Sequence, residues 1–159
     1  MKSKLFIFLA LFLNFTNAIA EDLLINSKNI KIDKKKNIVI LSNNVEVTDE
    51  KNNKITTFYA NYNKNNQILI TEGKTVILTS EGYKIATANI LLDNSKGIIS
   101  SNEETKVEDL EGNEIFLDMF SYNRNTNIIF SKGNINILDK NKNEFIFSEL
   151  YVDEKKRKL

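Results

Sequence analysis

Apolar and polar positions alternate along most of this chain, in a pattern that repeats every 30 residues. The alternation is seen in Val45-Glu46-Val47 and again in Ile135-Asn136-Ile137. A period of two residues is typical of β-strands, because successive side chains of a strand point to opposite faces. A fixed period between about 20 and 50 residues indicates a repeat architecture, in which each unit buries its apolar face against its neighbours. Four full units run from Ile25 to Glu144, and half a unit follows.

Two series of polar turns divide each unit into two strand segments. The first series opens at five residues in register, which are Asp33, Asn63, Asp93, Asn123 and Asp153. Asn and Asp favour turns because their side chains bond to nearby backbone groups and because they tolerate left-handed backbone conformations. The second series falls about half a period later, at residues 49–53, 79–83, 109–113 and 139–143.

Between these turns the apolar positions change parity. Ile128 and Phe130 have even numbers, whereas Ile135 and Ile137 have odd ones. A slip of one position turns every later side chain to the opposite face unless the strand bulges or bends. Gly133 lies within the slip, and a residue without a Cβ atom allows a kink there. The sequence therefore predicts long strands that bend in their middle, two in each unit.

These features predict an all-β fold with one of two architectures. Bent strands that reverse at every turn would form an elongated antiparallel jelly roll; a parallel β-solenoid, with one coil for each unit, is the alternative. One set of residues spaced by 30, which we call a column of the repeat, does not fit either architecture simply. Its residues lie between positions that we expect to point inward, and they are nevertheless apolar. This column consists of Val39, Leu69, Ile99 and Ile129. It implies that both faces of the sheet are partly covered, or that an exposed patch makes contacts.

The first twenty residues lie outside the repeat and have the pattern of an export signal. Lys2 and Lys4 precede a wholly apolar stretch at residues 5–13, and Ala18 and Ala20 provide a small-x-small cleavage site. Nine apolar residues are too few for a membrane-spanning helix, which needs about 20. We expect a signal peptide at residues 1–20, cleaved after Ala20, with an uncleaved anchor as the alternative. Residues 21–159 then form one domain whose last repeat is incomplete.

The composition argues against most enzyme chemistry. The chain has no His and no Cys, so it has no Ser-His or Cys-His pair, no ordinary zinc site and no disulfide. We expect no catalytic residues, no cofactor and no metal. Two alternatives depend on carboxylates. Glu103, Glu104, Glu108 and Asp109 could cleave a polysaccharide but fit a solvated turn better, and the Asp/Asn turn column could bind calcium but is explained by turn chemistry.

The charge balance argues against a nucleic-acid partner. The formal net charge of the full chain is +1, and loss of Lys2 and Lys4 with the signal peptide changes it to −1. A chain so nearly neutral has no electrostatic footprint for nucleic acid. The basic runs at 34–36 and 155–158 could contact anionic headgroups, although such runs are more often solvated.

The repeat units resemble a known family. The pattern of Tyr122-Asn123, Ile128-Ile129-Phe130 and Lys132-Gly133-Asn134-Ile135, and the similar stretch at residues 66–76, are similar to the OstA-like (organic solvent tolerance) domain. That domain occurs in the periplasmic bridge protein of lipopolysaccharide transport and at the N-terminus of the outer-membrane lipopolysaccharide assembly protein. The resemblance covers most of the chain after the signal, but it rests on a structural repeat and on no catalytic motif.

The resemblance implies a jelly roll, open at both ends, whose apolar interior binds the acyl chains of lipopolysaccharide. It implies a periplasmic protein that joins other OstA-like domains, or further copies of itself, by end-to-end strand pairing and so bridges the inner and outer membranes. On this hypothesis the lipid-binding groove is lined by Ile38, Ile40, Ile68, Ile70, Ile98, Phe120, Tyr122, Ile128 and Phe130.

The same resemblance predicts partner contacts at the two edge strands. Unpaired backbone groups at a terminal strand are natural sites for strand addition. The expected contact residues are Leu24, Ile30, Ile32, Phe145, Phe147 and Leu150. Two other interpretations remain: a structural solenoid that binds a partner protein or a surface polysaccharide, and an N-terminal fragment of the longer outer-membrane assembly protein.

Overall fold

The computed structural model describes residues 23–153 and shows fourteen β-strands joined in one sheet. Neither the predicted signal peptide nor the end of the last repeat lies within this range. No helix occurs in residues 23–153, and so none that could span a membrane. The strands are β1 (Leu24–Asn26), β2 (Asn29–Asp33), β3 (Ile38–Thr48), β4 (Lys54–Asn63), β5 (Ile68–Glu72), β6 (Thr75–Leu78), β7 (Lys84–Thr87), β8 (Leu91–Asp93), β9 (Ile98–Ser101), β10 (Thr105–Glu108), β11 (Glu114–Leu117), β12 (Phe120–Asn123), β13 (Ile128–Leu138) and β14 (Glu144–Asp153).

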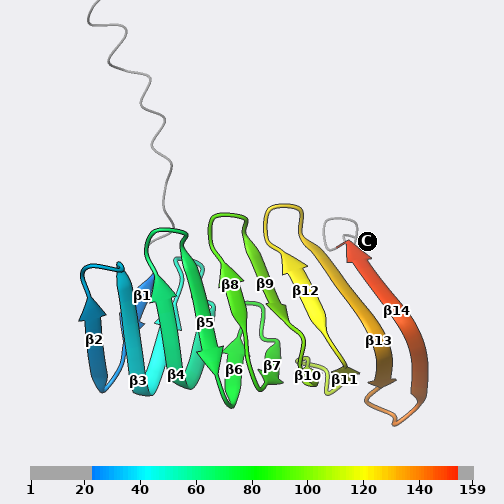
Figure 1. The fold of residues 1–159 in the computed structure, drawn as a ribbon. Coiled ribbons are helices and arrows are strands. Elements are labelled where there is room, and N and C mark those ends of the chain that lie inside the picture. Colours follow the sequence, from blue (N-terminus) through cyan, green and yellow to red (C-terminus); the bar gives the residue numbers. More distant parts are fainter. Residues whose placement is uncertain (1–22, 154–159) are drawn as a thin grey trace, which may run out of the picture.

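The strands form an elongated antiparallel roll (Figure 1). Some bent strands are divided into two short strands that follow each other along the chain, as β5 and β6 do, and β9 and β10. In contrast, β3, β4, β13 and β14 run through the bend without a break. Every pairing between neighbouring strands is antiparallel. The jelly roll of bent antiparallel strands is therefore confirmed, and the parallel solenoid is wrong.

The bends lie where the sequence changes parity. In β3 the register shifts between Ser42 and Val45, and in β13 it shifts between Lys132 and Ile135. Gly133 has φ +109, a conformation that L side chains rarely adopt. The predicted mid-strand kink is confirmed. It divides the sheet into an upper half, next to the turns that follow Asp33, Asn63, Asp93 and Asn123, and a lower half that folds against it.

Turn chemistry explains the Asp and Asn column. Asp33 Oδ1 accepts hydrogen bonds from the backbone N–H groups of Lys35 and Lys36, and Asn123 Oδ1 accepts two in the same way. In the lower series, Asp139 accepts bonds from both the backbone and the side-chain amide of Asn143, at 2.8 Å each. These side chains close turns, as predicted.

The core lies between the two halves of the folded sheet, and it includes the column that did not fit the predicted pattern. Val39 is 8% exposed and Leu69 is fully buried. The register places Leu69 beside Leu92, and Leu92 beside Ile99, on the same face. The expected inward parity of the upper half is thus wrong, because residues on both of its faces are apolar and alternation alone could not distinguish them.

Candidate functional site

The interior face has two levels on each half-sheet. Bend positions lie next to the line along which the sheet is folded. Rim positions lie two residues further along each strand, toward the turns. The rim of the upper half consists of Val39, Tyr62, Leu69, Leu92, Ile99, Tyr122 and Ile129. The rim of the lower half consists of Val47, Ile55, Ile77, Ile85, Val107, Ile115 and Ile137. The lower rim is therefore wholly aliphatic, and the upper rim is aliphatic apart from Tyr62 and Tyr122.

The rim is closed in the N-terminal half of the roll. Leu69 and Leu92 on the upper side are 0% and 3% exposed, and Val47 and Ile77 on the lower side are 2% and 3% exposed. These residues belong to one buried cluster with side chains from both half-sheets. Tyr62 is the partly exposed member of this stretch. The two half-sheets thus pack directly on each other here.

The rim is open in the C-terminal half. None of its residues there is fully buried, and several are partly buried neighbours of a small core made of Leu117, Phe120 and Ile135. Two of them, Ile85 and Ile99, also pack against the larger cluster of the N-terminal half. We call this set the C-terminal strip: Ile85, Ile99, Val107, Ile115, Tyr122, Ile129 and Ile137. An apolar surface that lies inside a fold and still reaches solvent is suited to an apolar ligand.

A row of buried hydroxyl groups lies at the bend. The Oγ1 atoms of Thr71 and Thr75 are 2.9 Å apart, and Thr75 also donates to Thr57 Oγ1 at 3.1 Å. Thr87 and Ser101 make an equivalent bond of 2.9 Å between the lower and upper halves. Because buried hydroxyl groups are costly unless they are bonded, these contacts tie the two half-sheets together at the fold line.

This row was not predicted from the sequence, although the repeat contains a signal for it. Thr71, Ser101 and Ser131 are spaced by 30, and so are Thr75 and Thr105. Hydroxyl residues that recur in register at interior positions indicate side chains that bond to one another inside the core.

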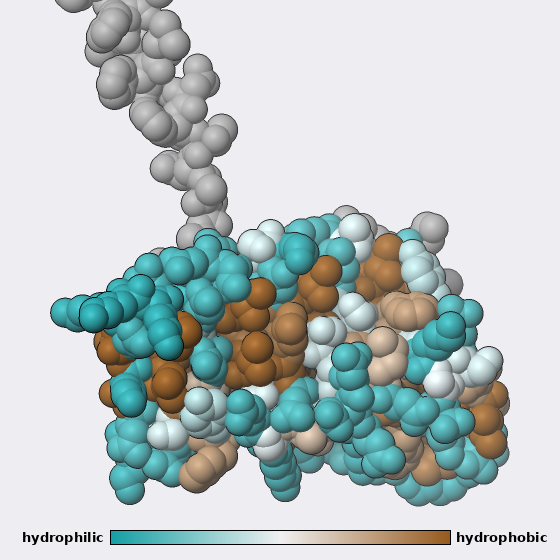
Figure 2. Space-filling view, viewed as in Figure 1, coloured by the Kyte–Doolittle hydropathy of each residue, from teal (hydrophilic) through white to brown (hydrophobic). Residues whose placement is uncertain are grey.

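The predicted lipid-contact residues lie on two different faces. Phe120 occupies a bend position and Tyr122 a rim position of the interior, and Tyr122 belongs to the C-terminal strip. The others lie on the outer face of the upper half-sheet, since each directly follows or precedes an interior residue of its strand: Ile38, Ile40, Ile68, Ile70, Ile98, Ile128 and Phe130. On that face they form an apolar surface together with Leu91, which is visible as the brown area in Figure 2.

The predicted edge residues lie on the terminal strands of the sheet. Within residues 23–153, β1 and β2 pair only with β3, and β14 pairs only with β13. Their large side chains are well exposed: Ile30 is 55% exposed, Ile32 56% and Phe145 48%. Leu150 is partly buried, and Leu24, at 73% exposed, points to the outer face. Interior apolar side chains are therefore uncovered at both ends of the roll.

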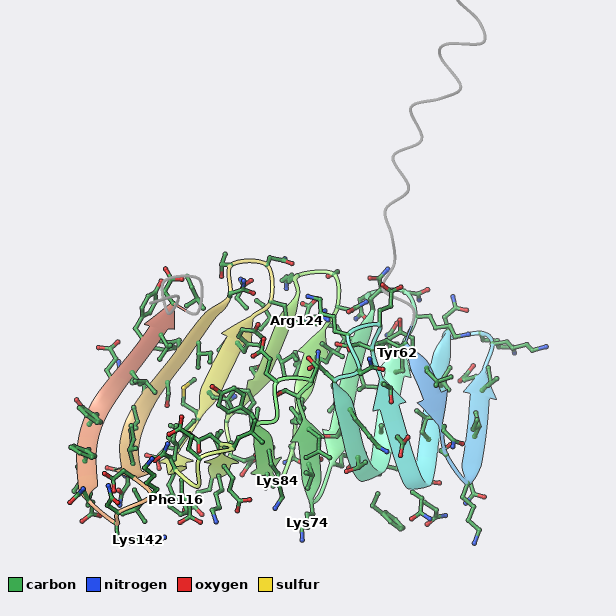
Figure 3. The ribbon with its side chains drawn as sticks, turned by 180° about the vertical axis from the view of Figure 1, so that it is seen from behind. Tyr62, Lys74, Lys84, Phe116, Arg124 and Lys142 are labelled. Atoms are coloured by element: carbon green, nitrogen blue, oxygen red, sulfur yellow. The ribbon has the colours of Figure 1, made fainter. Side chains whose placement is uncertain are left out.

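The outer face of the lower half-sheet is charged, unlike that of the upper half. Lys106 Nζ lies 2.8 Å from Glu108 and 2.6 Å from Glu114, and Lys84 lies 3.0 Å from Glu108. Hydrogen bonds from Lys106 hold the pKa of both glutamates below their ordinary value. Lys84 of this network and Phe116, whose ring lies beneath Lys106, are low on the sheet, whereas Arg124 and Tyr62 lie near the upper turns (Figure 3).

The candidate carboxylate cluster is divided between structural roles. Glu108 belongs to the lysine network, and Asp109 accepts backbone bonds from Glu111 and Asn113 within its turn. Glu103 and Glu104 are exposed at the bend between β9 and β10. Residues 23–153 contain no group of three or more His, Cys, Asp or Glu residues placed to bind a metal ion.

A shallow hollow of about 410 Å³ lies on the outer side of the bend, near the N-terminal end. Phe58, 65% exposed, lines it together with Asn44, Glu46 and Lys74. Glu46 is already paired with Lys54 at 2.6 Å. This hollow is separate from the C-terminal strip.

Comparison with known proteins identifies the fold. No family model matches the chain, and no curated protein matches its sequence. Among solved structures, the roll is similar to LptH of Pseudomonas aeruginosa, described as the LptA-homologous periplasmic component of the conserved lipopolysaccharide transport device. The TM-score is 0.61 and the sequence identity 16%, over 70% of this chain and 82% of LptH. The chain thus has an LptA-like fold.

Proposed function

We propose that this protein is a periplasmic carrier that shields the acyl chains of lipopolysaccharide and forms part of a bridge between the inner and outer membranes. The observation that carries the proposal is the C-terminal strip, an apolar interior surface that remains partly exposed along half of the roll. The LptA-like fold supports it, since LptH is described as a component of lipopolysaccharide transport. The export signal expected at residues 1–20 agrees with this location.

Burial of acyl chains supplies the binding energy. Each CH₂ group moved from water to an apolar environment gains roughly 0.8 kcal/mol. Side chains such as Ile99 and Ile129 are already partly dehydrated by their neighbours, so a lipid chain laid against them replaces only the remaining water. Lipid is thus held firmly and released without any covalent step.

The open ends of the roll are proposed to join successive domains. β2 and β14 occupy the same position in the 30-residue repeat, because Asp33 and Asp153 share a column, and so the two edges run in the same direction. A second domain added end to end would then pair its β2 in parallel with β14 of the first. In that register Lys28 of one edge would lie next to Glu149 of the other, an opposite-charge contact that favours this joint over two like ends.

A structural, partner-binding role is the second candidate, and the outer face of the upper half-sheet favours it. Ile70 and Leu91 on that face are 43% and 38% exposed, amid the other outward isoleucines. A contiguous apolar surface of this kind often marks a contact with another protein.

Two adjacent residues of β13 separate the two candidates. Ile129 points into the interior and Ile128 to the outer face. Each is replaced by Asp, and the folded variants are purified from a lipopolysaccharide-producing host and analysed for bound lipid by mass spectrometry. We expect Ile129→Asp to lose lipopolysaccharide and Ile128→Asp to keep it.

The reverse result would place lipid on the outer face, where most of the residues predicted from sequence lie. If the unaltered protein carries no lipid, even after incubation with lipopolysaccharide, the carrier proposal is wrong and the result favours the partner-binding role. Circular dichroism of each variant checks that loss of lipid is not loss of fold.

A further inference from the structure

Positions that are equivalent in the repeat differ in burial between the two halves of the roll. Leu69 is fully buried, whereas Ile99 and Ile129, 30 and 60 residues later in the same column, are partly exposed. Ile77 is 3% exposed, whereas Val107 and Ile137 in its column are partly exposed. Because the residue types are nearly the same, the difference arises from the packing around each position and not from the residue itself.

The opening is not a consequence of the free end of the sheet. β9 lies between β8 and β12, and β10 lies between β7 and β11, so Ile99 and Val107 have paired strands on both sides. Both are nevertheless partly exposed. The partial exposure of the rim therefore begins in the middle of the roll, at residues that do not lie at a free edge.

The bend stays packed along the whole roll, so only the rim opens. In the C-terminal half, Leu117 and Ile135 are 6% and 0% exposed at bend positions, and Ser101 and Thr105 are 4% and 2% exposed. Ser131 donates a hydrogen bond to the Met119 carbonyl at 2.6 Å. An inserted chain would thus meet a closed floor at the bend and two apolar walls at the rim.

The N-terminal half lacks this space and is held shut at the bend. Thr71 lies in the upper half-sheet and Thr75 and Thr57 in the lower, and their hydroxyl groups form a continuous bonded set. The backbone N–H of Ile90 adds a bond to Thr71 Oγ1 at 2.9 Å. Insertion of a lipid chain between Leu69 and Ile77 would require the separation of a closely packed core, which is unfavourable.

We propose that acyl chains bind only in the C-terminal half of the roll, along the C-terminal strip, and that the N-terminal half is a closed scaffold from which lipid is excluded. This inference rests on the proposed lipid-carrier function. It follows that a bound lipid does not slide through the whole domain but enters and leaves along the open rim.

The absence of cysteine from the chain allows a direct test. Single cysteines are introduced by Leu69→Cys and Ile77→Cys in the closed half and by Ile129→Cys and Ile137→Cys in the open half. Each pair occupies the same repeat columns, so the closed-half variants are matched controls. The rate of reaction with a soluble maleimide is measured with and without lipopolysaccharide.

We expect the open-half cysteines to react readily without lipid and severalfold more slowly with it, and the closed-half cysteines to react slowly in both conditions. Lipid-dependent protection at Leu69→Cys or Ile77→Cys would overturn the inference, and so would the absence of protection in the open half while lipid is bound. Retention of lipopolysaccharide by the unaltered chain in size-exclusion chromatography is measured separately. If lipid is not retained, the carrier function itself has failed.

A second measurement needs no substitution. Isoleucine methyl resonances of the unaltered chain are recorded with a fatty acid that carries a nitroxide on its alkyl chain. The inference predicts broadening of Ile99, Ile115 and Ile129 but not of Ile55 and Ile77. Equal broadening in both halves would contradict it.

Discussion

The unequal packing of the two halves predicts unequal costs for the same substitution at matched positions. Ile77 and Ile137 are both isoleucines in one repeat column and both are flanked by apolar residues on the neighbouring strands. Ile77 is 3% exposed, whereas Ile137 is partly exposed and belongs to the C-terminal strip. Replacement of each by Ala removes the same three carbon atoms from two different environments.

At Ile77 the loss includes both the transfer of the side chain and the cavity left behind, so Ile77→Ala should lower the free energy of unfolding by about 2–5 kcal/mol. At Ile137 no closed cavity forms, and part of the side chain is already in water. There the cost should be roughly 1 kcal/mol, less than half of the about 2.4 kcal/mol that three fully buried carbons contribute at ~0.8 kcal/mol each.

Urea unfolding of the chain without residues 1–20 measures both values, and the midpoints are comparable if the m-values agree. Ile146→Ala is the control, because Ile146 is 73% exposed on the outer face of the lower half-sheet, and its replacement should change stability by no more than about 0.5 kcal/mol. Equal losses at Ile77 and Ile137, or a larger loss at Ile137, would refute the division into a closed and an open half.

Three further predictions follow from the bend, the charge network and the edge. Gly133→Ala should destabilise the fold more than Gly73→Ala, because both have positive φ but only at Gly133 would a Cβ atom meet a neighbour, Asp118 Oδ2, at 2.7 Å; equal midpoints in urea would contradict this. Because the pKa of Glu108 and Glu114 is lowered by Lys106, their contribution to stability is complete above the ordinary value of 4.5 and is lost as pH falls through the lowered pKa. The stability difference between the wild type and Lys106→Met should therefore be present at neutral pH and vanish in acid, whereas a constant difference would show that it arises from packing. Phe147→Glu on the β14 edge should weaken end-to-end association in sedimentation velocity without loss of β-structure, and unchanged association would place the contact elsewhere.

The local structure of this protein could be predicted from its sequence because it depends on short-range patterns. Alternation identifies strands, the Asp and Asn columns identify turns, and the change of parity around Gly133 identifies the bend. Each of these predictions is confirmed: Asp33 closes its turn with Lys35 and Lys36, and β13 shifts register at Lys132. They could be made from the sequence because each feature depends on residues that are close together in the chain.

Which face of the upper half-sheet points inward was not determined by the sequence alone. Ile128 and Ile129 are both apolar, so periodicity does not distinguish the interior from the outer face in such a strand. The choice depends on the register with β12 and on packing against the lower half-sheet, which bring Tyr122 beside Ile129. For this reason most residues of the predicted groove lie on the outer face.

The opening of the rim is likewise a property of the tertiary structure. Leu69 and Ile129 occupy one column of the repeat, and no local feature of the sequence explains why one is buried and the other partly exposed. The repeat specifies how each bent strand pairs with the next, and small differences in bend and twist add up from strand to strand along the roll. The sequence thus determined the unit and its period, and the stacking of units decided where an apolar interior is closed and where it stays open.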